Sequence, residues 1–202
     1  MTKIKCCGLS RFCDIEAANR LMPEYIGFVF APKSRRYVSV EKARLLKQAL
    51  SPAIKAVGVF ANETPQQIAA LIDEGVIDIV QLHGNEDEAY IEKLRTFTDA
   101  PIIRAFCIET AADVEKAAQS MADAILLDSG AGSGKVFNWK LLAEIKRPYF
   151  LAGGLSANNI TKALQHLTPY AVDVSSGIET DGDKDQEKMA AFIAAVRKEE
   201  QR

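Results

Sequence analysis

Residues 54–84 read IKAVGVFANETPQQIAALIDEGVIDIVQLHG and contain one complete strand–helix–strand unit. The β-branched runs at 54–60 and 77–83 are typical of buried strands. Between them, Thr64 before Pro65 is a helix-start signal, and apolar residues recur with helical spacing over 65–74. Two strands that are joined through a helix pair in parallel, so this stretch predicts a parallel sheet covered by helices.

The same kind of unit recurs along the whole chain. Expected strands cover residues 3–7, 25–30, 54–60, 77–83, 102–106, 124–128, 149–152 and 171–175. Expected helices cover residues 13–21, 40–50, 65–74, 86–97, 111–120, 139–145, 157–167 and 186–197. Ser39, Asn85 and Ser156 precede three of these helices as further candidate N-caps. Eight such units predict either a closed (β/α)8 barrel or a large doubly wound sheet.

The positions of the polar residues favour the barrel. Residues able to do chemistry close many of the strands, and in a TIM barrel the C-terminal ends of all eight strands meet around one site. A doubly wound sheet would instead gather them in one crevice. No stretch rich in proline, glycine or serine divides the chain, so we expect residues 1–202 to form a single (β/α)8 barrel domain.

Composition limits the class of function. The 202 residues carry a net charge of -2, and 48% of them are hydrophobic, which excludes a disordered chain. Evenly mixed charge offers no basic face for a nucleic acid, so we expect a small anion held by a few local donors. No apolar run reaches membrane-span length and the first residues lack a secretory signal, so the expected location is the cytoplasm, with no membrane partner. The four cysteines include no Cys-x-x-Cys pair and are expected to be free thiols.

Strand alternation divides the first strand into two faces. Lys5 and Cys7 share one face, and Ile4 and Cys6 share the other. Since the apolar face suits packing beneath the helices, we expect Cys7 at the barrel mouth, where the ammonium of Lys5 would favour its thiolate. Cys7 is then a candidate base or nucleophile. The alternative is a small buried residue of the core.

Asp128 ends the apolar strand at 124–128 and precedes the glycine-rich loop 129–135. Partial burial would favour its protonated form, so Asp128 is a candidate general acid; the alternative is that it only caps the loop. The loop departs from the nucleotide phosphate-loop motif, because Ser129 and Val136 stand where that motif needs glycine and a hydroxyl residue. We interpret it as a flexible active-site loop.

Glycines also follow the last two expected strands. Gly153 and Gly154 come after the seventh strand, and Ser176 and Gly177 come after the eighth. Exposed backbone N–H groups in these two loops of a barrel commonly bind phosphate, so the pair of loops predicts a phosphate site. The alternative for either loop alone is a tight turn.

Three further features concern charge. The basic loop 33–37 follows the second strand, and one of its arginines could clamp a carboxylate; the alternative is a solvated loop. His83 closes the fourth strand, where it either lines the site or is a hydrogen-bonded structural histidine. Neither histidine of the chain has metal-ligand spacing.

Asp173 is costly to bury unpaired, and closure of the sheet would place its strand beside the first, so we predict an ion pair with Lys5.

Eight motifs follow one another along the chain: KCCGLSR (5–11), GFVF (27–30) with SRRYV (34–38), VGVF (57–60), VQLHG (80–84), LLD (126–128), GSGK (132–135), GGL (153–155) and VDVSSG (172–177). Together they resemble the phosphoribosylanthranilate isomerases of tryptophan biosynthesis. The resemblance covers residues 3–182, nearly the whole chain, and the fixed order of several motifs is much more specific than any one of them.

The resemblance implies a TIM barrel of the ribulose-phosphate-binding type and a cofactor-free Amadori rearrangement of N-(5-phosphoribosyl)anthranilate. It implies that Cys7 is the base, Asp128 the acid and Arg36 the ligand of the anthranilate carboxylate. The family's phosphate loops match Gly153–Gly154 and Ser176–Gly177. We count His83 with these candidate substrate-binding residues. The expected partner is a phosphorylated aminosugar, and a homodimer is possible.

Two alternatives stay open. The related aminoaldose isomerase of histidine biosynthesis shares the last two loops but uses paired aspartates, one of them at the end of the first strand, where this chain has Cys7. A non-catalytic phosphosugar-binding barrel would keep the glycine loops but would need neither Cys7 nor Asp128.

Overall fold

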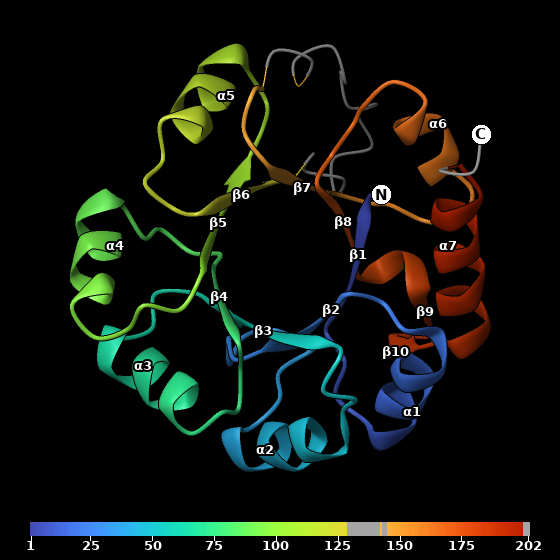
Figure 1. Ribbon diagram of the computed structural model, residues 1–202, viewed down its shortest axis with the longest axis horizontal. Coiled ribbons are helices and arrows are strands. Elements are labelled where there is room, and N and C mark those ends of the chain that lie inside the picture. Colours follow the sequence, from blue (N-terminus) through green and yellow to red (C-terminus); the bar gives the residue numbers. More distant parts are fainter. Residues whose placement is uncertain (129–141, 143–144, 200–202) are drawn as a thin grey trace.

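The computed structural model describes residues 1–128, 142 and 145–199. Eight parallel strands close into a barrel in which neighbours in sequence pair and the last strand pairs with the first (Figure 1). The strands are β1 (Lys3–Cys7), β2 (Tyr25–Val29), β3 (Lys55–Phe60), β4 (Ile79–Leu82), β5 (Ile102–Cys107), β6 (Ala124–Asp128), β7 (Tyr149–Ala152) and β8 (Ala171–Val174). The predicted (β/α)8 barrel is confirmed, and each strand boundary lies within about two residues of the expected one.

Helices surround the barrel (Figure 1). They are α1 (Phe12–Leu21), α2 (Val40–Ala49), α3 (Pro65–Asp73), α4 (Glu88–Arg95), α5 (Ala111–Ala118), α6 (Ile160–Leu164) and α7 (Gln186–Glu199). The predicted loop 129–135 lies outside the described residues, as does the predicted helix 139–145 apart from its residues 142 and 145. Within the described part of the chain, no helix is long and apolar enough to cross a membrane.

Two of the predicted helix starts are confirmed. The Ser39 side chain accepts a hydrogen bond from the backbone N–H of Lys42 at the start of α2. Thr64 does the same for Gln67 at the start of α3, with Pro65 in the first turn. These caps satisfy backbone N–H groups that have no partner within the helix.

The other two predicted starts are wrong. Asp87 rather than Asn85 caps α4, because Glu86 belongs to the preceding loop. The buried carboxylate of Glu86 accepts hydrogen bonds from the backbone N–H groups of Asn62 (2.6 Å) and Gly84 (2.7 Å). Helix α6 begins at Ile160 rather than after Ser156, because residues 157–159 form a turn.

Alternation along the strands produces two separate apolar cores. One fills the barrel interior with Tyr25, Val57, Ile103, Leu126, Phe150, Ala152 and Ala171. The other lies between the strands and the helices and includes Ile4 and Cys6. Because successive side chains of a strand point to opposite faces, Lys5 and Cys7, which alternate with Ile4 and Cys6, point into the barrel interior.

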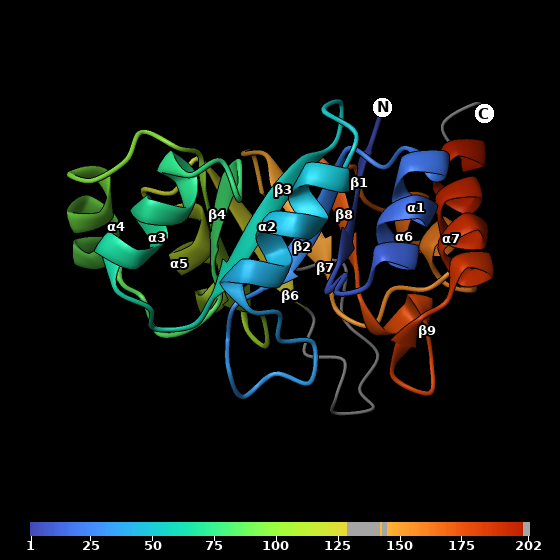
Figure 2. The same cartoon turned by 90° about the horizontal axis from the view of Figure 1, so that it is seen from below.

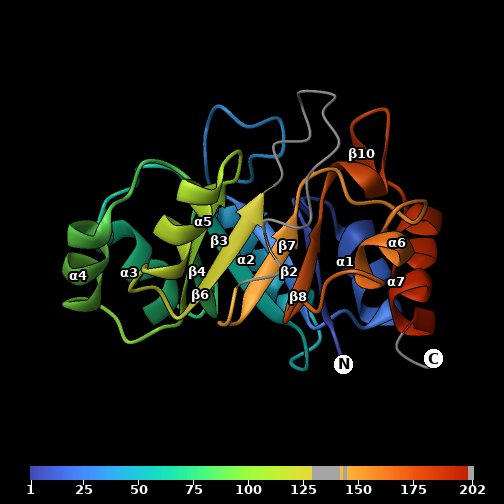
Figure 3. The same ribbon diagram turned by 90° about the horizontal axis from the view of Figure 1, so that it is seen from above.

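The two ends of the barrel differ in what projects from them. The N-terminus lies at one end, and the loop after β2 projects from the other (Figures 2 and 3). A small hairpin of β9 (Glu179–Thr180) and β10 (Asp183–Lys184) projects from the same end as that loop. The strand pattern of the sequence did not predict this hairpin, which adds chain at the end where the eight strands finish.

Candidate active site

A cavity of about 740 Å³ opens where the eight strands end. Residues of all eight strands or of the loops that follow them line it: Cys7, Val29, Ala31, Ser34, Arg36, Val59, Phe60, Ala61, Gln81, His83, Gly84, Ala105, Phe106, Cys107, Asp128, Ala152, Gly153, Gly154, Leu155, Asp173, Ser175 and Ser176. Seven of the eight predicted site residues are among them, Gly177 being the other. Convergence of side chains from many strands on one cavity is the usual arrangement of a catalytic site in this fold.

Cys7 lies at the cavity, and its neighbour Cys6 is fully buried in the outer core, as strand alternation predicts. Cys7 packs against Val29 and Val59. Gly27 makes room for the thiol, because a Cβ there would lie 2.6 Å from the Cys7 Sγ. Burial raises the pKa of the Cys7 thiol, and the nearby ammonium of Lys5 lowers it by less. The expected effect of Lys5 on the thiol is therefore confirmed, but burial outweighs it, so the net pKa shift of Cys7 is upward.

The predicted ion pair between Lys5 and Asp173 is confirmed. Lys5 Nζ lies 3.0 Å from Asp173 Oδ1, and the lysine side chain is completely buried. The strands β1 and β8 are paired in parallel with these two residues as direct partners. Burial is the largest single influence and lowers the pKa of Lys5, but the charges of Asp173 and Cys7 and their hydrogen bonds together outweigh it, so the net shift is upward and Lys5 keeps its proton. The cavity thus has a fixed ammonium beneath its thiol.

Asp128 ends β6 and lies across the barrel from Cys7, on the wall of the same cavity. The residue is partly buried, as its position at the end of an apolar strand predicts. Its backbone carbonyl accepts a hydrogen bond from Ile108 (3.0 Å), which fixes the strand end. Cys7 and Asp128 are therefore a thiol and a carboxyl that reach one ligand space from different strands.

The glycine loops pack directly on each other. Gly153 and Gly154 have φ angles of 98° and 59°, a backbone conformation that favours glycine. A Cβ at Gly177 would lie 1.9 Å from the backbone oxygen of Leu155, so only glycine allows this close approach. Ser175 connects the loop after β8 to the end of β1, because its Oγ donates a hydrogen bond to the backbone carbonyl of Cys7 (3.1 Å). Gly177 thus shapes the two loops although it does not line the cavity.

Arg36 lines the cavity, and its guanidinium is held by Glu179. Nε of Arg36 lies 2.6 Å from Glu179 Oε1, and Nη2 lies 2.9 Å from Oε2. The Arg36 side chain crosses Gly8, where a Cβ would approach Arg36 Cδ to 2.5 Å. The sequence pattern singled out the basic loop but gave no role to Glu179, since this residue follows the last strand with no motif of its own.

His83 fits both of its predicted roles. It is exposed at the cavity wall, and its Nδ1 lies 3.0 Å from Nε2 of Gln81. Gln81 is 1% exposed and also lines the cavity. Within the described part of the chain, its Oε1 is the one buried side-chain oxygen or nitrogen without a hydrogen-bond partner. A buried amide oxygen without a partner at a cavity wall is a candidate ligand contact, and sequence reasoning missed it.

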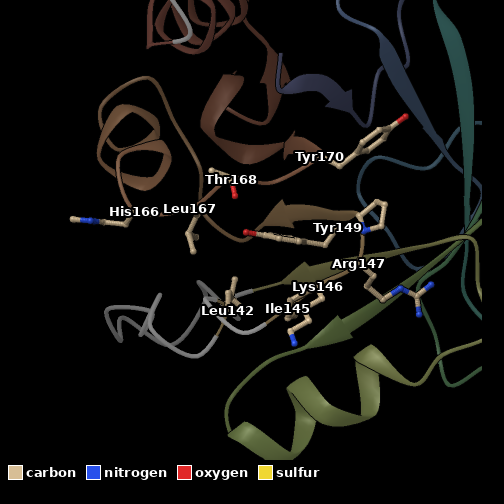
Figure 4. Close-up of a pocket in the computed structure, with 10 residues that line it drawn as sticks. Leu142, Ile145, Lys146, Arg147, Tyr149, His166, Leu167, Thr168 and Tyr170 are labelled. Atoms are coloured by element: carbon tan, nitrogen blue, oxygen red, sulfur yellow. The ribbon is translucent and has the colours of Figure 1, made fainter. Parts of the chain in front are cut away.

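A second cavity of about 460 Å³ lies at the opposite end of the barrel, between the segments that lead into β7 and β8 (Figure 4). The Tyr149 hydroxyl points to the side on which Leu167 and Thr168 lie, and the Arg147 guanidinium points the other way. Arg147 donates to the backbone oxygens of Ser120 and Ala122, which holds the connection between α5 and β6 in place. No thiol or carboxyl group is among its described lining residues, so this cavity lacks the chemistry of the first.

Among residues 1–128, 142 and 145–199, no group of three or more histidine, cysteine, aspartate or glutamate side chains is placed to hold a metal ion.

Residues 4–195 match the protein-family model described as "N-(5'phosphoribosyl)anthranilate (PRA) isomerase". The isomerase of this name from Clostridium acetobutylicum is 46% identical over 98% of this chain and 99% of its own length. That of Streptococcus gordonii is 43% identical, with 98% of each chain covered. The crystal structure of phosphoribosyl anthranilate isomerase from Thermotoga maritima has a TM-score of 0.88 at 34% identity, over 98% of this chain and all of the other.

A further solved isomerase holds a ligand. It is described as a complex with reduced 1-(o-carboxyphenylamino)-1-deoxyribulose 5-phosphate. Its TM-score is 0.87 at 33% identity, over 98% of this chain and all of the other. Fold and sequence therefore point to the same group of proteins across nearly the whole chain.

Proposed function

The chain belongs to the N-(5'-phosphoribosyl)anthranilate isomerase family, and on that premise we propose which of its residues carry the reaction. It is an isomerase of tryptophan biosynthesis, which converts N-(5-phosphoribosyl)anthranilate into 1-(2-carboxyphenylamino)-1-deoxyribulose 5-phosphate by an Amadori rearrangement. The observation that supports our assignment of residues is the meeting of Cys7 and Asp128 at one cavity.

In the proposed mechanism Asp128 acts first, as the general acid. It protonates the ring oxygen of the furanose, the bond between this oxygen and C1' breaks, and a protonated Schiff base forms with the anilino nitrogen. The cation acidifies the neighbouring C–H bond, so no metal or other cofactor is needed. Cys7 then removes the C2' proton as a thiolate, and the resulting enolamine tautomerises to the ketone.

The surroundings of Cys7 support the role of a base rather than of an exposed nucleophile. Burial raises its pKa, so the thiolate is a strong base once formed, and the charges of Lys5 and Lys184 lower the cost of forming it. The ammonium of Lys5 is held near the thiol because it is paired with Asp173 at 3.0 Å.

The two ends of the substrate are anionic and need separate sites. We assign the phosphate to the backbone N–H groups of Gly153, Gly154, Ser176 and Gly177 in the loops after β7 and β8. We assign the anthranilate carboxylate to Arg36, which can form a forked pair with it. Between these ends, His83 and the unpaired amide oxygen of Gln81 line the cavity wall and are proposed to contact the substrate.

Domain organisation, assembly and location complete the proposal. We propose that residues 1–202 work as one barrel domain. A homodimer is proposed because an isomerase from Thermotoga maritima, 34% identical with a TM-score of 0.87, is described as dimeric. Light scattering would distinguish a monomer of 22.1 kDa from a homodimer of twice that mass. A reducing cytoplasm suits the four free cysteines.

The test follows the fluorescence of phosphoribosylanthranilate, generated in situ, in the presence of EDTA. We expect rapid loss of fluorescence with the wild-type chain and with Cys6→Ala. Cys7→Ala and Asp128→Asn should each slow turnover by about 10²- to 10⁴-fold, the usual size of acid–base contributions. Full activity of Cys7→Ala, or loss of activity in Cys6→Ala with its fold intact, would contradict the assignment of the base.

A binding measurement completes this test. Each inactive variant should still bind a reduced product analogue, because the substitutions leave the phosphate and carboxylate sites in place. A wild-type chain that binds the analogue but never turns over substrate would instead be a phosphosugar-binding barrel.

A further inference from the structure

Three cations converge on one buried carboxylate beside the cavity. Besides Arg36, Glu179 accepts hydrogen bonds from Arg35 Nη2 (2.7 Å) and Lys184 Nζ (2.6 Å). The Glu179 side chain is 4% exposed. Burial raises the pKa of Glu179, but hydrogen bonds from Arg36 and Lys184 outweigh it and lower this pKa to about 2. Glu179 is therefore an anion at neutral pH, at the edge of the site.

The small hairpin fixes this carboxylate in space. Glu179 and Lys184 are paired residues of β9 and β10. Lys184 Nζ also donates to the carbonyl of Ser175 (2.9 Å), and Lys188 Nζ donates to the Glu179 carbonyl (2.7 Å). The carboxylate is thus held through both its side chain and its backbone, as a residue that orients another group requires.

The contact with Glu179 leaves part of the Arg36 guanidinium available. Glu179 engages Nε and Nη2. A guanidinium has five N–H groups in one plane, so Nη1 and the second N–H of Nη2 form another edge with the same fork geometry. One arginine can therefore hold Glu179 on one edge and a second carboxylate on the other.

The charge balance favours a second anion. Arg35, Arg36 and Lys184 surround a single carboxylate, which leaves an excess of two positive charges in this cluster. Pairing with Glu179 therefore orients Arg36 without neutralising the cluster. A carboxylate that approaches from the cavity still meets a positive potential.

We propose that Glu179 is a positioning residue for substrate recognition, which holds the Arg36 guanidinium so that its free edge binds the carboxylate of the aromatic ring. This inference rests on the proposed function and deepens it, since Glu179 acts through Arg36 and does not itself touch the substrate. A fixed guanidinium loses little conformational entropy on binding, so removal of its anchor weakens affinity more than turnover.

The test compares two substrates that differ only in the recognised carboxylate. N-(5-phosphoribosyl)anthranilate and N-(5-phosphoribosyl)aniline are each formed in situ from ribose 5-phosphate and the aromatic amine, and the ketose products are measured by chromatography. For the anthranilate compound, we expect Glu179→Gln to raise KM and lower kcat/KM by about 10- to 100-fold, the usual worth of a charge-assisted contact. For the aniline compound, the change should stay below about threefold, because Arg36 has no carboxylate to bind.

Two further variants provide controls. Arg35→Gln removes an ion pair of Glu179 from a side chain that is largely exposed and does not line the cavity. Because solvent screens the charge of this exposed side chain, we expect Arg35→Gln to change the ratio of kcat/KM between the two substrates far less than Glu179→Gln does. In an Arg36→Met background, Glu179→Gln should change this ratio no further, because the two residues act through one contact.

Stability has to be separated from recognition. Glu179→Gln leaves Lys184 buried without its counter-charge, so thermal unfolding is measured in parallel. If that variant does not fold, Glu179→Gln with Lys184→Met removes both charges, and the ratio between substrates is read from the double variant.

Equal losses of kcat/KM for both substrates would overturn the proposal, since Glu179 would then only maintain structure. An additional change of the ratio in the Arg36→Met background would also overturn it. A wild-type chain without activity on the anthranilate compound would instead contradict the proposed function, so the two failures are distinguishable.

Discussion

The two ends of the barrel interior are built from different kinds of contact. At the end where the strands begin, Phe150 lies between Tyr25 and Tyr170, with ring centroids 5.6 Å and 5.8 Å away. The two tyrosine hydroxyls lie 3.2 Å apart, and Lys3 donates to Tyr170 (2.6 Å). At the end where the strands finish, the interior holds the Lys5–Asp173 pair and the Cys7 thiol, and the carboxylate of Glu179 lies beside it in the β9–β10 hairpin.

This difference separates stability from activity along one axis. Aromatic packing at the first end removes apolar surface from water at little electrostatic cost. Buried charges at the second end lose hydration that their partners only partly replace, so they contribute little net stability. They do supply a fixed potential around the reacting groups. Substitutions at the two ends should therefore have different consequences for unfolding and turnover.

The largest effect on stability is expected from breaking the central ion pair. Lys5→Met leaves Asp173 buried without a counter-charge, which should cost about 3–5 kcal/mol in the free energy of unfolding. Denaturant unfolding, monitored by circular dichroism, measures this loss. Asp173→Asn in the same background should restore part of the stability, because it removes the unpaired charge. Full stability of Lys5→Met would contradict the claim that Asp173 needs the ammonium of Lys5 as its counter-charge.

The second largest effect on stability is expected from acid, which should destabilise the end of the barrel where the strands finish. Because the pKa of Glu179 is about 2 in the fold and 4.5 ordinarily, its contribution is present above pH 4.5 and is lost as pH falls toward 2. One pKa unit corresponds to about 1.4 kcal/mol, so the contribution is at most about 3 kcal/mol. Unfolding of wild type and Glu179→Gln at several pH values tests this. Their difference in stability should shrink between pH 4.5 and 2, and a constant difference would contradict it.

A smaller effect should follow from separating the two glycine loops. The Cβ of Gly177→Ala would strike the Leu155 backbone, so we expect a loss of about 1–3 kcal/mol and a raised KM for the phosphorylated substrate. Gly75→Ala is the control for replacing a glycine without a clash, because nothing lies within 4 Å of its Cβ position, although its φ is positive (67°) and that of Gly177 is not. The control should lose some stability through strain and keep its KM. A raised KM in both variants would show that the loop contact is not the cause.

The smallest effect is expected at the first end. Tyr25→Phe keeps the buried ring but removes the hydroxyl that meets Tyr170, which should cost about 0.5–1.5 kcal/mol. Turnover should stay unchanged, since this residue lies a layer below the cavity. Steady-state kinetics and thermal unfolding of the same sample measure both. A loss of kcat without a loss of stability would contradict the separation of the two ends.

Much of the fold could be predicted because its signals are local. The β-branched runs located β1 to β8, and Ser39 and Thr64 marked two helix starts correctly. Alternation put Cys7 inside the barrel and Cys6 outside it. Closure then placed Lys5 beside Asp173, as predicted. These features depend only on backbone periodicity and on the order of the strands.

Other features could not be read from the chain. Glu179 meets Arg36 across 143 positions of sequence, and neither residue carries a mark of that contact. Asp87, and not Asn85, caps α4 because Glu86 stays outside the helix, where its carboxylate accepts a hydrogen bond from the backbone of Asn62. The pKa of Cys7 depends on a balance between burial and the charge of Lys5, and only the packed structure gives the extent of each.

The sequence by itself determined the barrel, the faces of its strands and the thiol, carboxyl and glycine loops at its mouth, because these follow from short-range periodicity and residue chemistry. Only the tertiary structure decided which charges meet and which groups lose water. Ion pairing depends on positions in space to within about an ångström, and desolvation depends on every neighbour. For this reason the tertiary structure, and not the sequence, placed Glu179 behind Arg36 and raised the pKa of Cys7.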